Sequence, residues 1–437
     1  MKRVFRRSAV LLAAVLALTC CFIAGTGYAS GNIDLTFTAW SYGVETVNDN
    51  IAKFEQMYPG IKVSFSDFSW FDYHDIMATR FFSKTPTDVC YSSDHWLQEW
   101  AAAGWIVPLE DYFPWVRESK SEFAKYAVEG MTYQGKLYGV PYYADLMIFI
   151  YNEDMLKKAG FNHPPTTWEE LAEQAKVMKA KGICKYPIIF EFGQQEAAAN
   201  EVFISMVYSR KDGHMFNGLE PVFNAPGSAA LKTVEWITDG MQNSKIIDPS
   251  SLTMAEIELV KSMQAGQHAF TILPKYNLAE LNNPASSKLA GKFKMALMPG
   301  DTHETVGYVR FYAMTKMAVD RGKDVVDAVG KFIQYFGGKT NGKYIVEKRW
   351  AVEKGLGFAQ LPLYDDPDVI KAINSWGDVK LELEQAKLAR AKEGLSPFYG
   401  TWDLFVRTEL HKAYLGQQSP KQVLDSCASK WNEMRKK

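Results

Sequence analysis

The sequence is poor in cysteine, and the cysteines that it has are far apart. There are 5 among 437 residues: Cys20 and Cys21 lie near the N-terminus, whereas Cys90, Cys184 and Cys427 are widely separated. An odd number of distant cysteines does not build a disulfide framework, and neither they nor the scattered histidines have the spacing of metal ligands. We therefore expect buried free thiols in the body of the chain, with no metal site and no cofactor.

A marked excess of one charge is also missing. The chain has 49 Lys and Arg residues against 50 Asp and Glu residues, which gives a net charge of −1, and the basic residues are scattered. Proteins that bind nucleic acids or anionic membranes normally carry a basic patch or stripe. The sequence therefore indicates neither a nucleic acid nor a membrane surface as a partner.

Long hydrophobic runs are confined to the first thirty residues. Cationic residues lie within positions 2–7, residues 9–24 are apolar, and the small residues Gly27 and Ala29 follow. The apolar run is shorter than a membrane-spanning helix needs, and the whole pattern is typical of a secretory signal peptide. We predict that residues 1–29 are a signal peptide and that the chain is exported. The alternative is an N-terminal anchor that is retained.

Cys20 and Cys21 make lipid anchoring a second alternative. Lipoproteins are cleaved just before a cysteine that follows small residues, and the sequence LTCC matches this pattern only in part. Thr19 or Cys20 stands where Gly, Ala or Ser is usual. The mature protein is therefore expected to be periplasmic or at the cell surface, either soluble or lipid-anchored.

After residue 30 the hydrophobic pattern alternates between strands and helices. Residues 33–37 predict a short strand, an amphipathic helix follows, and residues 61–65 predict a second strand. A strand, a helix and a strand at this spacing indicate a right-handed βαβ unit with parallel strands. Short apolar runs at 89–91 and 146–151 continue the alternation. The sequence therefore predicts an α/β fold.

Two polar residues predict where helices begin. Asn152 precedes Glu153 and Asp154, which suit the positive end of a helix, and Thr167 is followed by Glu170 at the spacing of a capping box. We expect helices to start directly after Asn152 and Thr167.

Several stretches, in order along the chain, resemble one family. They are IAKFEQMYPGIKV, TPTDVCYSSDHWLQEWAAAGWIVPLEDY, GKLYGVPYYADLMIFIYNEDMLKKAGF, PPTTWEEL, QAGQHAFTI, AVGKFIQYFGG and VRTELHKAYLGQQSPKQVLDSCASKW. Together they cover nearly the whole mature chain. The sequence resembles the extracellular solute-binding proteins of ATP-driven importers, the group that includes maltose-binding protein.

The resemblance implies a type II periplasmic-binding-protein fold, with a cleft between two lobes that crossing hinge strands connect. It implies an N-terminal lobe of residues 31–143 and 274–313. The C-terminal lobe would hold residues 144–273 and 314–437. It also implies a monomeric, non-enzymatic protein that binds a carbohydrate, expected to be an oligosaccharide, and delivers it to membrane permease subunits.

Candidate ligand-binding residues lie at strand ends and at positions that match the family's motifs. Trp40, Ser41 and Tyr42 follow the first strand, although Trp40 could equally belong to the core. The residues carried over by the resemblance are Asp94 and His95 after the strand 89–91, Asp145, Tyr276 after a crossing strand, and Trp402 and Asp403 just before VRTEL.

Asp145 is the most prominent of these candidates, because it is an isolated acid at the mouth of a buried strand. Ligands of open α/β sheets sit outside the carboxyl ends of strands and at lobe boundaries. A carboxylate there can accept hydrogen bonds from two sugar hydroxyls, and neighbouring aromatic rings can cover the sugar. The alternative is a hinge residue whose carboxylate holds backbone N–H groups.

Tyr308 and Arg310 depart from the family's pattern, which has small residues near the cleft at these positions. A guanidinium fork suits a carboxylate or phosphate. We therefore hypothesise a ligand with an acidic group, such as a uronate-containing sugar. The alternative is an arginine that pairs with a neighbouring acid of the protein.

Two other functions compete with the sugar receptor. A secreted glycosidase needs two carboxyl groups at a fixed separation, and Asp94, Asp145 and Asp403 could mimic such a set, although no local motif pairs any two of them. A receptor for a metal or another small polar solute is the third possibility. The lack of metal-ligand spacing argues against ferric iron.

Overall fold

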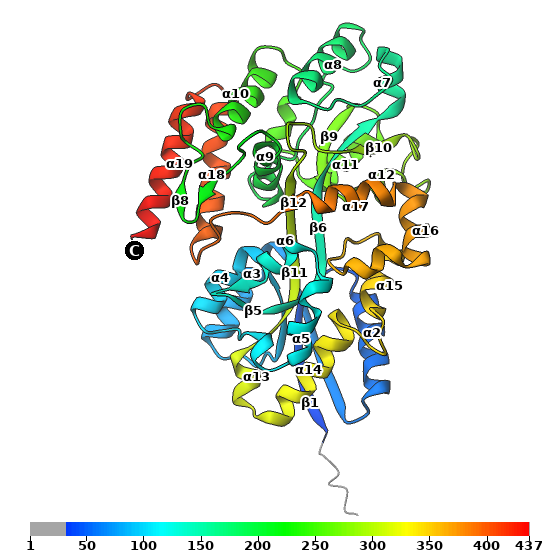
Figure 1. Ribbon diagram of the computed structural model, residues 1–437, viewed down its shortest axis with the longest axis vertical. Coiled ribbons are helices and arrows are strands. Elements are labelled where there is room, and N and C mark those ends of the chain that lie inside the picture. Colours follow the sequence, from blue (N-terminus) through cyan, green and yellow to red (C-terminus); the bar gives the residue numbers. More distant parts are fainter. Residues whose placement is uncertain (1–31, 437) are drawn as a thin grey trace, which may run out of the picture.

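The computed structural model describes residues 32–436, which form two lobes, one above the other in Figure 1. The predicted signal peptide and Cys20 and Cys21 lie outside these residues. An eight-stranded sheet has the strand order β10-β6-β11-β3-β1-β2, with β9 paired to β6 and β12 paired to β11. Helices cover this sheet in both lobes, as the α/β pattern of the sequence predicts.

The first lobe begins with parallel strands joined by helices. β1 pairs in parallel with β2 from Ile33↔Ile61 to Trp40↔Phe68, and with β3 at Phe37↔Val89. The predicted βαβ unit is therefore confirmed, and each strand runs two or three residues beyond its expected end. The elements of this lobe are β1 (Ile33–Trp40), α2 (Val44–Met57), β2 (Ile61–Phe68), α3 (Trp70–Phe82), β3 (Val89–Ser93), α4 (Asp94–Ala102), α5 (Pro114–Ser119), α6 (Lys125–Gly130), β4 (Thr132–Tyr133), β5 (Lys136–Leu137), α13 (Lys316–Asp320), α14 (Lys323–Gly337), α15 (Ile345–Lys354) and α16 (Pro367–Trp376).

The second lobe contains most of the other helices, the strands β9 and β10 beside the crossing strand β6, and a separate pair of short strands, β7 and β8. Its elements are α7 (Glu153–Ala159), α8 (Trp168–Ala180), α9 (Ala198–Tyr208), β7 (Phe216–Asn217), β8 (Glu220–Pro221), α10 (Ala229–Gln242), α11 (Glu256–Gln264), β9 (Phe270–Pro274), α12 (Asn277–Leu281), β10 (Phe293–Ala296), α18 (Tyr399–Tyr414) and α19 (Pro420–Arg435). The Asn152 side chain accepts from the backbone N–H of Met155, and that of Thr167 accepts from Glu170. Both predicted helix starts are confirmed.

Two long strands pass through both lobes. β6 (Gly139–Asn152) and β11 (Thr305–Met314) are antiparallel, from Gly307↔Leu146 to Ala313↔Gly139, with a register shift between Arg310 and Phe311. Figure 1 shows them running between the lobes. A third connection contains α17 (Val379–Lys387) and β12 (Ala389–Arg390). These are the crossing strands that the family resemblance implies.

The two lobes have separate hydrophobic cores, and these cores correct the predicted lobe boundaries. Residues 35–144 share the first core with residues 309–373. Residues 147–308 and 399–431 form the second core, with a smaller cluster that includes Phe293 and Met295. The segment 274–308 therefore belongs to the second lobe, and 314–373 to the first. The prediction was wrong here because β11 passes from the second lobe into the first. The elements that precede β11 therefore belong to the second lobe, and those that directly follow it belong to the first.

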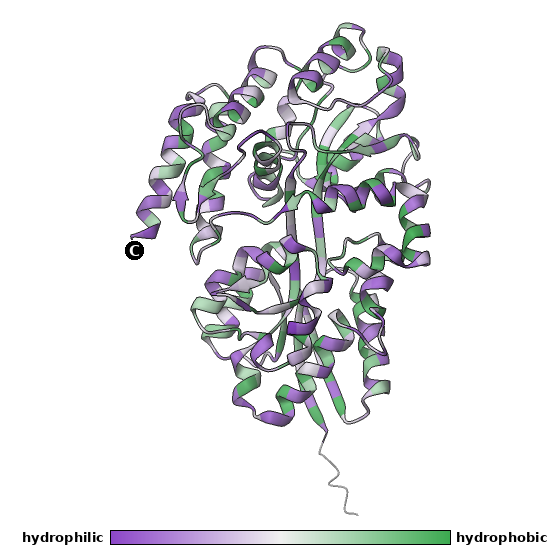
Figure 2. Cartoon of the chain, viewed as in Figure 1, coloured by the Kyte–Doolittle hydropathy of each residue, from purple (hydrophilic) through white to green (hydrophobic). Residues whose placement is uncertain are grey.

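The helices at the surface are amphipathic. Figure 2 shows hydrophilic and hydrophobic residues along the same outer helices, such as α8 and α19. Among residues 32–436, no helix combines the length and the apolar character that crossing a bilayer requires. Cys90, Cys184 and Cys427 are free and buried, as expected.

Candidate ligand-binding site

A cavity of about 500 Å³ lies where the crossing strands connect the lobes. Its wall on the first lobe is aromatic, and its wall on the second lobe is acidic. The lining residues are Trp40, Ser41, Tyr42, Trp70, Phe71, Tyr142, Tyr143, Glu196, Ala197, Ala198, Glu201, Ala255, Glu256, Ile257, Glu258, Pro274, Tyr276, Tyr308, Arg310 and Leu356.

The aromatic wall is held by edge-to-face and stacked contacts. Trp40, at the carboxyl end of β1, meets Trp70 edge-on with ring centroids 5.1 Å apart, and Tyr142 of β6 at 5.8 Å. Tyr142 in turn stacks on the buried Tyr91 at 4.2 Å. Aromatic pairs prefer such geometries, and the packing fixes the ring planes before a ligand arrives. The wall is thus a preformed apolar surface that faces the cavity.

Arg310 belongs to a buried group of charges behind this wall. Its Nη1 lies 2.6 Å from Oδ1 of Asp94, and its guanidinium lies 4.8 Å from the ring centre of Tyr308. Lys392 pairs with both acids of the group: its Nζ lies 2.9 Å from Oδ2 of Asp94 and 2.7 Å from Oε1 of Glu201. Nε2 of His95 lies 3.1 Å from Nζ of Lys392. We call these five residues the charge cluster.

The charge cluster joins the two lobes. Asp94 begins α4 of the first lobe, Glu201 lies on α9 of the second, and Lys392 follows β12 in the third connection. Burial alone would raise the pKa of Asp94, but Lys392 and Arg310 hold it well below its ordinary value. Glu201 also has a lowered pKa, because Lys392 and the other cations outweigh its burial. The two acids and two cations therefore balance, so the cluster adds no net charge to the cavity.

The pairing of Arg310 favours the alternative to an acidic ligand. Its Nη1 is bonded to Asp94, and Glu201 lies 3.9 Å from its Nη2. The alternative stated from the sequence, an arginine paired with a neighbouring acid, is what the structure has. Sequence reasoning could not choose between them, because Asp94 is 216 residues away.

Asp145 is not at the cavity surface either. It is fully buried within β6, and its carboxylate accepts from the backbone N–H of Leu146 at 2.8 Å, the backbone N–H of Tyr276 at 3.2 Å and the hydroxyl of Tyr143 at 3.1 Å. Burial raises its pKa to about 6, although Lys275 opposes the shift. The predicted ligand contact is therefore corrected: Asp145 is a hinge acceptor where the chain passes from one lobe to the other.

Trp402 and Asp403 are structural residues of the second lobe. The buried indole of Trp402 donates to the carbonyl of Cys427 at 2.9 Å, which ties α18 to α19. Asp403 accepts from the side-chain amide of Asn200 at 2.6 Å and pairs with Arg407 at 3.1 Å. Neither lines the cavity, so the prediction of ligand contact is wrong for both.

The other candidates lie at the cavity or directly behind it. Trp40, Ser41, Tyr42, Tyr276, Tyr308 and Arg310 line it. Asp94 and His95 are buried in the charge cluster, behind the lining residues Arg310 and Glu201. Trp70 and the acidic residues of the second lobe were missed. Trp70 follows the strand β2 just as Trp40 ends β1, and this parallel position is the signal that could have found it.

Three glutamates of the second lobe face the aromatic wall. Glu256 and Glu258 lie in the first turn of α11, and Glu196 precedes α9. The hydroxyl of Tyr276 donates to Glu256. Burial nevertheless raises the pKa of Glu256 to about 7. The cavity therefore offers several carboxyl acceptors opposite flat apolar rings.

A wider groove of about 1170 Å³ continues from the cavity and shares Tyr42, Glu256, Ile257 and Tyr276 with it. This groove runs between the lobes to Asn282 of the second and Trp376 of the first. The combined surface is longer than one sugar ring.

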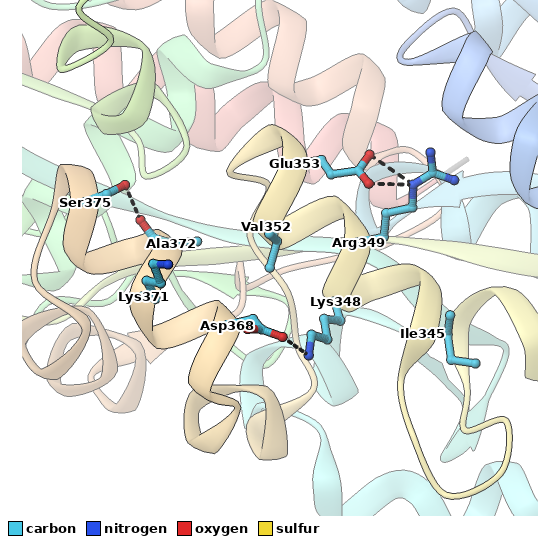
Figure 3. Close-up of a pocket in the computed structure, with 9 residues that line it drawn as sticks. All are labelled: Ile345, Lys348, Arg349, Val352, Glu353, Asp368, Lys371, Ala372 and Ser375. Carbon is cyan, nitrogen blue, oxygen red and sulfur yellow. Dashed lines mark hydrogen bonds and ion pairs between the residues drawn. The ribbon is translucent and has the colours of Figure 1, made fainter.

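A further hollow of about 540 Å³ lies on the surface between α15 and α16 and shares Val352, Glu353, Ala372 and Ser375 with the groove (Figure 3). Four of its charged groups are paired with one another: Lys348 lies 2.7 Å from Asp368, and Arg349 lies 3.0 Å from Glu353. Its lining contains no aromatic ring. Because it lacks the aromatic surface of the cavity, we place the ligand site between the lobes.

Comparison with known proteins agrees with this architecture. Residues 40–343 match the sequence family of bacterial extracellular solute-binding proteins. The chain belongs to this family. This solute-binding protein is 25% identical to a lactose-binding protein of Rhizobium radiobacter over 321 residues, which are 66% of this chain and 71% of the relative.

Other relatives match over shorter or less similar stretches. A binding protein of Brucella abortus is 29% identical over 154 residues, 35% of this chain, so the match spans 37% of that relative's length. The maltose-bound MalE3 of T. maritima superposes with a TM-score of 0.77, at 21% identity, over 92% of this chain and 100% of that one. This superposition confirms the predicted two-lobe type II fold.

Proposed function

We propose that this solute-binding protein is the substrate-binding component of an ABC importer and that it binds a carbohydrate in the cavity between its lobes. One observation carries the proposal: a preformed aromatic wall on one lobe faces hydrogen-bonding carboxyl groups on the other. Pockets with apolar faces and a few convergent polar groups are typical of small-molecule sites. The names of the relatives, a lactose-binding protein and a maltose-bound protein, support a sugar.

The two walls suit the two kinds of surface that a sugar presents. Trp40, Trp70 and Tyr142 can cover the C–H faces of a pyranose ring. Stacking on an aromatic side chain contributes about 1–3 kcal/mol for nucleobases, the nearest available scale. The carboxyl groups of Glu196 and Glu256 can accept hydrogen bonds from hydroxyls, each worth roughly 1.5–3 kcal/mol when the acceptor is charged. The continuing groove supports an oligosaccharide rather than a single ring.

Binding would favour closure of the lobes. A ligand that contacts both walls only in the closed arrangement shifts the population toward it by its difference in affinity for the two states. A shift from 1:99 to 99:1 needs roughly 5.5 kcal/mol. Two or three charged hydrogen bonds and one stacked ring supply that amount. β6 and β11 provide the hinge, and the permease subunits of the importer would recognise the closed form.

The cellular setting is part of the same proposal. The family is extracellular by name, and residues 1–29 have the pattern of a signal peptide. We propose that the protein works as a monomer outside the cytoplasmic membrane, either soluble or anchored through Cys20 or Cys21.

The glycosidase alternative has lost its candidate carboxyl groups. Asp94 is paired with Arg310 and Lys392, Asp145 holds backbone N–H groups, and Asp403 is held by Asn200 and Arg407. None of the three lines the cavity. We therefore propose that the protein binds its sugar and releases it intact.

A panel of mono- and oligosaccharides tests this function. We expect at least one of them to raise the melting temperature, because a ligand that binds only the folded state stabilises it. X-ray scattering with the same sugar should show a smaller radius of gyration. If no saccharide changes either quantity, or if oligosaccharides are cleaved, the proposal is wrong.

A further inference from the structure

The charges that line the cavity are unbalanced. Within the charge cluster, Arg310 and Lys392 offset Asp94 and Glu201. The remaining charged residues of the lining are Glu196, Glu256 and Glu258, and all three are acids. Arg310, the cation among the lining residues, is thus already paired with Asp94. The three glutamates therefore have no cation of the lining to pair with.

Glu196 has an accessible carboxylate without a partner. It is half-buried on the cavity wall, and its carboxylate has no hydrogen-bond or ion-pair partner among residues 32–436, whereas its backbone bonds to Gly193 and Ala199. Burial raises its pKa, with the nearby carboxyl groups of Glu201 and Glu258 adding to the shift and Arg407 opposing it. Arg407 is itself paired with Asp403 at 3.1 Å. A cation placed at the cavity surface would therefore meet an unsatisfied acceptor.

Glu191 is a second unsatisfied carboxyl group, which lies behind the cavity lining and feels the charges of Glu256 and Glu196. It is completely buried, and neither of its oxygens has a hydrogen-bond partner of good geometry among the described residues. Burial, followed by the charges of Glu256, Glu196 and Glu201, raises its pKa well above the ordinary value. Only the backbone N–H of Glu256 favours its charged form. Glu196 thus makes ionisation of both Glu191 and Glu256 less favourable, and Glu256 does the same to Glu191.

Aromatic rings line the cavity together with these carboxyl groups. The face of an aromatic ring is electron-rich and attracts cations, and a group of such rings with carboxylates nearby is the usual environment for bound ammonium groups. Trp40, Trp70 and Tyr142 line the cavity together with Glu196 and Glu256, and the guanidinium of Arg310 already lies 5.4 Å from the ring centre of Trp70. A neutral sugar would desolvate the carboxyl groups further without reducing their mutual repulsion, whereas a cation would reduce it.

We propose that the carbohydrate bound by this protein carries a protonated amino group, which lies between the aromatic wall and the carboxylates of Glu196 and Glu256. This inference rests on the proposed sugar-binding function and names the class of its substrate: amino sugars or amino-substituted oligosaccharides. It is the opposite of the acidic ligand that Arg310 suggested from the sequence alone.

The test compares matched ligands in the full mature chain. Disaccharides of glucosamine and galactosamine are titrated by calorimetry beside their N-acetylated forms, neutral disaccharides and uronate-containing disaccharides at neutral pH. The N-acetylated forms keep the ring and lose the charge. We expect the free amines to bind at least about tenfold more tightly than the N-acetylated forms, the ratio that one well-placed charged interaction gives.

Two variants locate the amino group. Glu196→Gln and Glu256→Gln keep the shape of the side chain and remove its charge, and each should reduce the preference for the free amine at least about fivefold. Glu235→Gln, on the exposed side of α10, is the control and should leave the preference unchanged. Because the readout is a ratio of two affinities in one protein, partial unfolding of a variant does not produce it.

The outcomes separate this inference from the function on which it rests. Equal or tighter binding of neutral, N-acetylated or uronate sugars overturns the amino-group inference and leaves sugar binding intact. An amine preference that survives both Glu→Gln changes also overturns it. If no carbohydrate in the panel binds, the proposed function fails, and the inference fails with it.

Discussion

Nη1 of Arg310 lies 2.6 Å from Oδ1 of Asp94, with both side chains buried and 216 residues apart in the sequence. The two residues are close because Arg310 of β11 is opposite Ser93, the last residue of β3, and Asp94 follows Ser93 at the start of α4. Lys392 and Glu201 complete the group from the other lobe. A charge pair of this kind costs desolvation, and it is stable only while every partner is present.

Removal of Arg310 should therefore destabilise the protein strongly. Arg310→Met leaves Asp94 buried with one of its two cations, and we expect a loss of about 3–5 kcal/mol in the free energy of unfolding. Urea denaturation measures it. As a control, Lys323→Met removes an exposed pair with Asp327 and should produce no measurable change. A small effect of Arg310→Met would contradict the structural role of the charge cluster.

The carboxyl group of Asp145 should make stability fall as the pH rises. Its pKa in the folded protein is about 6, above the value of about 3.9 for an unfolded chain. The native state therefore binds more protons than the unfolded state between these two pH values, so this group's contribution decreases as the pH rises through that interval. A shift of about two units corresponds to about 3 kcal/mol.

Comparison of the wild type with Asp145→Asn isolates this contribution. The difference in unfolding free energy between the two proteins should change between about pH 4 and pH 6 and stay constant above that range. Other titrating groups cancel in the difference. A constant difference across the whole range would show that Asp145 is not a buried hinge acceptor.

Gly357 should be intolerant of a side chain. A Cβ atom there would lie 2.2 Å from the carbonyl oxygen of Ala144 and 2.9 Å from Cγ of Asp145, so the backbone of the hinge would have to move. We expect Gly357→Ala to lower stability by about 1–3 kcal/mol, the usual cost of overpacking. The control is Gly400→Ala in α18, where a Cβ meets no atom within 4 Å. Alanine in a helix should stabilise that variant by roughly 0.5–1 kcal/mol, and thermal unfolding distinguishes the two signs.

Loss of an aromatic ring from the cavity should weaken binding without unfolding the protein. Trp70→Ala removes one face of the wall, and we expect affinity for the sugar to fall by about 1–3 kcal/mol, which is roughly 5- to 150-fold. Phe82→Ala changes the other end of the same helix, where the ring is 88% exposed, and is the control. Calorimetric titration of both variants tests the position of the site. An unchanged affinity of Trp70→Ala would place the ligand elsewhere.

The local elements of this fold follow from nearby residues. The strands at 33–40 and 61–68 and the helix between them are set by apolar periodicity, which acts over a few residues. The starts of α7 and α8 are set by Asn152 and Thr167, whose side chains bond to backbone groups three residues away. Residues at the end of the first strand, Trp40 to Tyr42, also identified part of the cavity, because the carboxyl ends of parallel strands meet at one edge of a sheet.

What the sequence by itself determined is therefore the α/β pattern, the family and the kind of residue at the strand ends. The tertiary structure alone decided which charges are paired. Asp94, Glu201, Arg310 and Lys392 meet across nearly three hundred residues, and only the crossing of β11 and the third connection brings them together. The tertiary structure also decided that the carboxylate of Asp145 accepts from backbone N–H groups and that Glu196 lines the cavity. Periodicity and capping act within a few residues, whereas the balance of charge in a cleft depends on contacts that only the complete fold makes.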